Sequence, residues 1–98
     1  MSKMEAKLEV EGISTAECYQ ICVSSIDLIG YILFKKRDLA NLIICNETST
    51  GQKTNLSLMV PFGSPTMINL SLSSDEMDDA ALKVEADRIL EIISTNLK

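Results

Sequence analysis

Two stretches of the chain carry the same tetrapeptide, Asn-Leu-Ser-Leu, at residues 55–58 and 69–72, and a segment containing proline and glycine separates them. Strict alternation of apolar and polar residues is the pattern of a half-buried β-strand. Proline and glycine interrupt regular structure and favour turns. The two stretches therefore predict an antiparallel pair of strands, with one face on a core and the other facing outward.

The same alternation predicts which side chains of this pair point inward. The expected inward set is Leu56, Leu58, Val60, Ile68, Leu70 and Leu72, and the expected outward set is Ser57, Met59, Met67, Asn69 and Ser71. The outward set is uncharged, whereas a solvated sheet face usually carries Lys, Glu and Thr. Methionine adapts well at protein contacts. This face is therefore either a contact surface for another protein or a solvated face of modest polarity.

A strand and a helix are expected before this pair. Residues 7–11 alternate between charged and apolar side chains, and Leu8 and Val10 would face the core. Ser14 and Glu17 have the spacing of a capping box, which predicts a helix over residues 15–29. One face of that helix is apolar and contains Cys18, Cys22, Ile26 and Ile29, and Gly30 is its expected C-terminal cap.

Two short apolar runs follow, at residues 31–34 and 39–45. Their aromatic and β-branched content favours a hairpin, with Lys35-Lys36-Arg37 in a solvated turn between the strands. The alternative is that the preceding helix extends through Phe34, which leaves one strand here. Residues 46–54 are polar, contain Gly51 and predict a loop.

The last element is a helix with a clear apolar stripe. Ser73 and Glu76 have capping-box spacing, and several acidic residues follow where the helix dipole favours negative charge. The stripe consists of Leu82, Ala86, Ile89 and Ile93. On the opposite side, Lys83 and Asp87 are one turn apart and are expected to pair.

These elements predict one α+β domain over residues 1–98, in the order β-α-β-β-β-β-α. Every strand offers one apolar row, so we expect an antiparallel sheet of four to five strands with both helices on one face. This order is similar to that of helix-grip domains and of a single repeat of the TATA-box-binding-protein fold. The similarity covers the order of the elements only, and it implies no function.

Composition excludes several classes of partner. The formal net charge of −5 repels nucleic acid and anionic membranes. No run reaches the roughly 18 apolar residues of a membrane span, and residues 1–7 lack the apolar stretch of a signal peptide. The cysteine count of 3 is odd, which argues against a disulfide framework. We therefore expect a cytoplasmic protein with reduced thiols that binds neither nucleic acid nor membrane.

The residues needed for catalysis are not assembled in any recognisable motif. The chain has no histidine, so a cysteine nucleophile would lack its usual base. Cys18, Cys22 and Cys45 fall in predicted apolar rows, where free cysteine behaves as a small buried hydrophobe. Three thiolates with an acidic fourth ligand would be an alternative, a zinc site. Core packing is the stronger interpretation, so we expect no enzyme, cofactor or metal.

The sequence therefore predicts a non-enzymatic protein–protein interaction module, acting as a homodimer. Its expected interaction surface consists of Ser57, Met59, Met67, Asn69 and Ser71, with Phe62 in the turn as an additional candidate. Phe62 is either an anchor for a partner or, as the favoured interpretation, a plug that closes one end of the core. The alternative function is binding of a small apolar ligand, in a pocket between the sheet (Leu58, Leu70) and the last helix.

Overall fold

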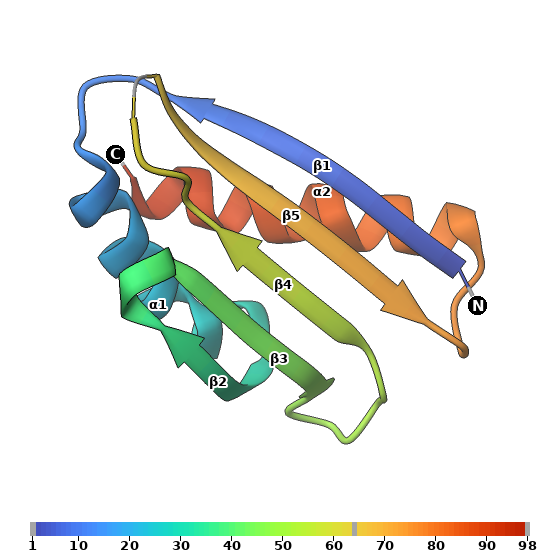
Figure 1. Cartoon of the computed structure of the whole chain (residues 1–98). Coiled ribbons are helices and arrows are strands. Elements are labelled where there is room, and N and C mark those ends of the chain that lie inside the picture. Colours follow the sequence, from blue (N-terminus) through green and yellow to red (C-terminus); the bar gives the residue numbers. More distant parts are fainter. Residues whose placement is uncertain (1, 64, 98) are drawn as a thin grey trace.

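The computed structural model describes residues 2–63 and 65–97, and it has the expected α+β architecture. Five antiparallel strands form one sheet in the spatial order β1-β5-β4-β3-β2, and both helices lie behind the same face of it (Figure 1). The strands are β1 (Ser2–Val10), β2 (Tyr31–Arg37), β3 (Leu42–Thr48), β4 (Asn55–Met59) and β5 (Thr66–Ser74). The α-helices are α1 (Thr15–Ile29) and α2 (Asp79–Asn96), and a short 3₁₀ turn spans Asp38–Ala40.

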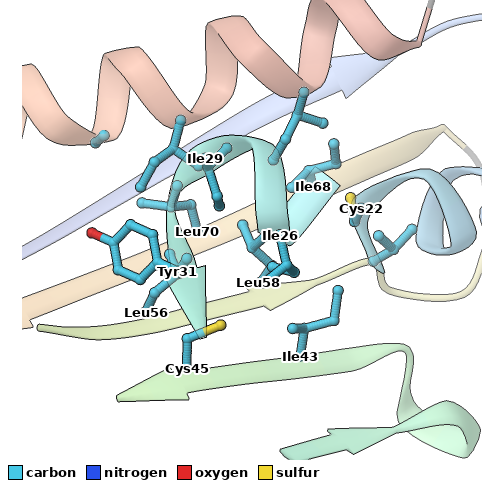
Figure 2. Close-up of a cluster of buried hydrophobic side chains, with 14 of the residues drawn as sticks. Cys22, Ile26, Ile29, Tyr31, Ile43, Cys45, Leu56, Leu58, Ile68 and Leu70 are labelled. Carbon is cyan, nitrogen blue, oxygen red and sulfur yellow. The ribbon is translucent and has the colours of Figure 1, made fainter. Parts of the chain in front are cut away.

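The core lies between the sheet and the two helices. All six residues expected to point inward from β4, β5 and the residue after β4 are at most 2 % exposed, which confirms the predicted faces. The helices contribute their predicted stripes, and Cys22, Ile26 and Ile29 of α1 belong to one buried cluster with the inward residues of the sheet (Figure 2). Aliphatic side chains fill this core because the chain has few aromatic residues.

Helix α1 begins and ends where its sequence signals predict. The Ser14 hydroxyl accepts a hydrogen bond from the Glu17 backbone N–H at 3.2 Å, which satisfies one of the free donors at the helix start. Gly30 has a φ of 83°, the left-handed conformation that ends many helices and that glycine adopts without strain. The hairpin prediction is confirmed as well, because Tyr31 begins strand β2 and the helix does not continue through Phe34.

The turn of this hairpin was predicted at the wrong place. Lys35, Lys36 and Arg37 continue β2, and the chain turns at residues 38–41 instead. Asn41 supplies the left-handed conformation, with a φ of 49°, and its side-chain amide donates to the Val60 carbonyl at 3.2 Å. Asparagine adopts the left-handed conformation readily, and its side chain can form hydrogen bonds within a turn. Asn41 therefore decides where the chain turns, and the run of three basic residues does not.

Pairing along the sheet also extends two strands beyond their predicted bounds. β1 begins at Ser2 rather than at residue 7, because all of its residues pair with β5, from Ser2–Ser74 to Val10–Thr66. β3 continues to Thr48, which pairs with Tyr31, so the following loop covers only residues 49–54.

The start of α2 differs from the prediction, although its apolar stripe is confirmed. Ser73 belongs to β5, and the N-cap is Asp78, whose carboxylate accepts from the Ala81 backbone N–H at 2.8 Å. The stripe residues Leu82, Ala86, Ile89 and Ile93 are all buried. Lys83 and Asp87 form the expected ion pair, with 3.3 Å between the charged atoms.

Removal of this cap tests the corrected helix start. An Asp78→Ala variant is expected to lose about 1 kcal/mol of unfolding free energy, because an N-terminal N–H of the helix loses its acceptor. Ser73→Ala is the matched control, and it should change stability by no more than about 0.5 kcal/mol. Urea unfolding followed by circular dichroism measures both. An equal or larger loss of unfolding free energy in Ser73→Ala would identify Ser73 as the N-cap instead.

Candidate interaction surface

The outward residues of β4 and β5 come together on the face of the sheet opposite the helices. Ser57 pairs with Ser71 and Met59 with Asn69 across the two strands, while Met67 pairs with Glu9 of β1. All five predicted surface residues are half-buried, because neighbouring side chains on the face partly cover them. Within the described residues, no helix covers this face, which we call the open face (Figure 1).

The neighbouring strands complete the open face. β3 adds Leu42 and Ile44, which pair with Met59 and Ser57 respectively. Beyond them, Lys35 and Arg37 of β2 pair with Ile44 and Leu42 and give this side of the face a positive rim. At the other side, the outward residues of β1 are charged and alternate in sign, in the order Lys3, Glu5, Lys7, Glu9. The open face therefore has an uncharged centre between two charged rims.

A depression extends from the centre of the open face to its β1 rim. A solvent-open depression of about 520 Å³ lies over β1, β5, β4 and β3. Its lining includes Glu5, Lys7, Leu42, Ser57, Met59 and Asn69. Four of the six predicted surface residues line the depression, namely Ser57, Met59, Asn69 and Ser71. The depression combines apolar side chains with one acidic and one basic side chain.

Leu42 and Ile44 were not identified from the sequence. Residues 42–45 are apolar at every position, so the run shows no alternation from which a face could be assigned. In the structure Ile43 and Cys45 are buried in the core, while Leu42 and Ile44 are half-buried on the open face. Pairing with β4 decides which of these four residues face the core and which face outward. This pairing joins segments that are apart in the sequence, so the local pattern does not contain it.

Phe62 does not close the core, so the favoured interpretation of this residue was wrong. Its side chain is 67 % exposed in the loop between β4 and β5. That end of the core is closed by Val60, which is buried and whose N–H donates to the Asn41 carbonyl at 3.0 Å. Phe62 is also outside the residues that line the depression. The other interpretation of Phe62, an anchor for a partner, stays a prediction.

A second exposed apolar surface lies at the β2 edge. In the run from Tyr31 to Phe34 only Tyr31 is buried, and Phe34 is 63 % exposed. The pairing of β2 with β3 is irregular around Leu33, and Phe34 has no partner in the register. A β-bulge of this kind twists an edge strand and re-aims its side chains, which accounts for an apolar run that faces solvent. Leu39 in the following turn is 95 % exposed.

The three cysteines are core residues. Cys18, Cys22 and Cys45 are fully buried and unpaired, and Figure 2 shows Cys22 and Cys45 in different parts of the core. Burial raises the pKa of each thiol, for Cys45 to about 11, so the thiols stay protonated at neutral pH. Among residues 2–63 and 65–97, no cluster of three or more Cys, Asp or Glu side chains has a metal-binding arrangement.

One acidic residue of α2 is largely withdrawn from solvent. The Glu85 side chain is only 16 % exposed. It accepts hydrogen bonds from the Tyr31 hydroxyl and from Arg88 Nε, both at 2.7 Å, and Arg88 Nη2 donates to the Ile29 carbonyl at 2.8 Å. The Arg88 guanidinium lowers the pKa of Glu85. This network ties α2 to the junction of α1 and β2.

In the described part of the chain, neither helix has the length and hydropathy needed to cross a membrane. Compared with known protein families and with curated proteins, the sequence matches none.

Proposed function

We propose that the protein is a non-enzymatic protein–protein interaction module that acts as a homodimer in the cytoplasm. The observation that supports this best is the open face. Both helices cover one side of the sheet, while the other side presents an uncharged, hollowed centre. Buried, protonated thiols are compatible with a reducing compartment.

The open face has the composition of a binding surface for a protein. Protein interfaces combine an apolar centre with a polar rim, and methionine is enriched in them. Here Met59, Leu42 and Ile44 lie at the centre, and the charges of β1 and β2 lie at the rims. We propose that a protein partner docks on this centre and that the rims select its orientation through opposite charges.

The alternative function, an apolar ligand between the sheet and α2, has less support. Leu58 and Leu70 of the sheet and Leu82 and Ile89 of α2 are each at most 2 % exposed. They belong to one buried cluster. A ligand there would have to separate packed layers, and a domain of this size has little other core to compensate.

Substitution on the open face tests the proposal. The tagged protein, purified from its own host, is used to capture partners, and each captured protein is then purified and its affinity measured directly. Met59→Lys is expected to weaken that affinity about tenfold or more, which corresponds to about 1.4 kcal/mol, because a charge replaces an apolar contact at the centre.

The matched control is Val84→Lys, which introduces the same charge at an exposed apolar residue of α2. It should leave the affinity unchanged, and circular dichroism should show both variants folded. Partners that bind Met59→Lys as tightly as the unaltered protein would contradict the role of the open face.

A further inference from the structure

We propose that two copies of this chain join through the free edges of β1, antiparallel, with a two-fold axis at Ala6. The inference rests on the homodimeric interaction module proposed above, and it names the surface that forms the dimer. Among residues 2–63 and 65–97, β1 is the last strand of the sheet and pairs with β5 alone, so its other edge carries unpaired backbone groups. Such an edge accepts another strand when the side chains allow it.

The charges of β1 are complementary to their own reversed copy. Lys3, Glu5, Lys7 and Glu9 lie on the same face of the strand and are all exposed. With the axis at Ala6, Glu5 lies opposite Lys7 of the second copy, and Lys3 lies opposite Glu9 of the second copy. Opposite charges directly across two antiparallel strands stabilise the pairing. Every charged residue of β1 thereby meets an opposite charge.

The other face of β1 is complementary in the same register. Met4 lies opposite Leu8 of the second copy, and Ala6 lies opposite its own equivalent. These three residues pack against the core and yet stay half-buried, because the described part of the chain places no strand beyond β1. Pairing with a second copy would cover the remaining exposed area of an apolar row that the single copy leaves incomplete.

Other registers are disfavoured by the same charges. An axis at Glu5 places Glu5 opposite Glu5 and Lys3 opposite Lys7, and an axis at Lys7 again opposes like charges. An axis at Met4 or at Leu8 places opposite charges across from each other, but only part of β1 then has a partner residue in the second copy. A two-fold axis perpendicular to the sheet keeps every side chain on its own face. An axis midway between two residues would pair side chains of opposite faces, so the axis must pass through a residue position. The Ala6 register therefore uses the strand most fully.

The opposite edge of the sheet does not share this property. The first half of β2 is apolar and its second half is basic, so reversal places Ile32 against Lys36 and Leu33 against Lys35. The bulge at Phe34 also interrupts the strand. β1 is therefore the edge that fits a second copy.

Such a dimer would also extend the open face. Strand addition keeps both open faces on the same side, and both pairs of helices on the other. The depression is bounded by Glu5, Ala6 and Lys7, which are the residues around the axis. The two depressions would therefore lie side by side across the axis, in one continuous sheet.

Charge reversal tests the register, because each substitution acts on both sides of a two-fold axis. Glu5→Lys places lysine against Lys7, and Lys7→Glu places glutamate against Glu5, so each single variant is expected to be monomeric in analytical ultracentrifugation. The double variant restores opposite charges and is expected to dimerise. An equimolar mixture of the two single variants is expected to form heterodimers, because every cross-strand pair is then complementary.

Glu91→Lys on α2 is the control for net charge, since it makes the same change at an exposed residue away from β1. It should dimerise like the unaltered protein, and circular dichroism should show every variant folded. A monomeric unaltered protein would overturn both the proposed homodimer and the β1 interface. A dimeric protein whose folded Glu5→Lys and Lys7→Glu variants still dimerise would overturn the β1 interface alone. These measurements use no partner, so they are independent of partner binding at the open face.

Discussion

Leu70→Asp is expected to abolish folding. Leu70 lies in the middle of β5, is 2 % exposed, and pairs with Ala6 on one side and Leu58 on the other. Removal of a buried leucine side chain costs about 2–5 kcal/mol. A carboxylate in its place adds several kcal/mol more, because it is buried without a partner. The sum approaches or exceeds the roughly 5–15 kcal/mol that stabilises a domain of this kind.

The matched control is the next residue in the chain. Asn69 is on the opposite face of the same strand and is half-buried on the open face, so Asn69→Asp is expected to fold with only a small change in stability. Near-UV circular dichroism and thermal scans distinguish the two variants. A cooperatively folded Leu70→Asp protein would contradict the assignment of faces on which the open face depends.

The second large effect is expected at the Glu85 network. Glu85→Ala leaves the buried Tyr31 hydroxyl without its acceptor and removes both hydrogen bonds from Arg88 to the carboxylate. Hydrogen bonds to charged groups contribute about 1.5–3 kcal/mol, so we expect a loss of about 2–3 kcal/mol in urea unfolding at pH 7. Glu91→Ala, an exposed residue of the same helix, should cost no more than about 0.5 kcal/mol.

This loss should depend on pH in a defined direction. The Arg88 hydrogen bonds lower the folded-state pKa of Glu85 below its ordinary value of 4.5, so the folded state binds fewer protons than the unfolded state in that range. The stabilisation is therefore complete above pH 4.5 and is lost as the pH falls through the folded-state pKa. The difference between the unaltered protein and Glu85→Ala should narrow in acid. A difference that is constant from pH 7 to pH 3 would contradict an ionic contribution.

The local pattern of this sequence predicts which face of a strand each side chain occupies. It predicts less well where the strands and helices begin and end. A period of two places Leu70 inward and Asn69 outward whatever the partner strand is. The start of α2 is harder to predict from the local pattern, because Ser73 has capping-box spacing yet pairs with Asn55 and Lys3 in the sheet. Backbone pairing with two neighbouring strands outweighs a local cap, and those neighbours are distant in the sequence.

The candidate surface was predictable to the extent that it depends on alternation. The residues that share this face stand at alternate positions of β4 and β5, between the inward-facing residues of each strand: Ser57, Met59, Met67, Asn69 and Ser71. Strand order was not readable, so the sequence could not show that β1 brings its charges beside Ser71 and Asn69, or that β3 adds Leu42. Phe62 was misjudged because turn geometry, rather than hydropathy, decides where a loop side chain points.

The pairing of β1 with β5 has a consequence for synthesis. α1 and strands β2 to β4 follow one another closely in the chain, so their contacts form as the segments leave the ribosome. β1 leaves the ribosome before them, yet its partner strand emerges only after β4. It must therefore remain unpaired while most of the domain is made, and long-range strand pairing of this kind slows folding. The alternating charges of β1 keep the waiting nascent segment hydrated until β5 emerges.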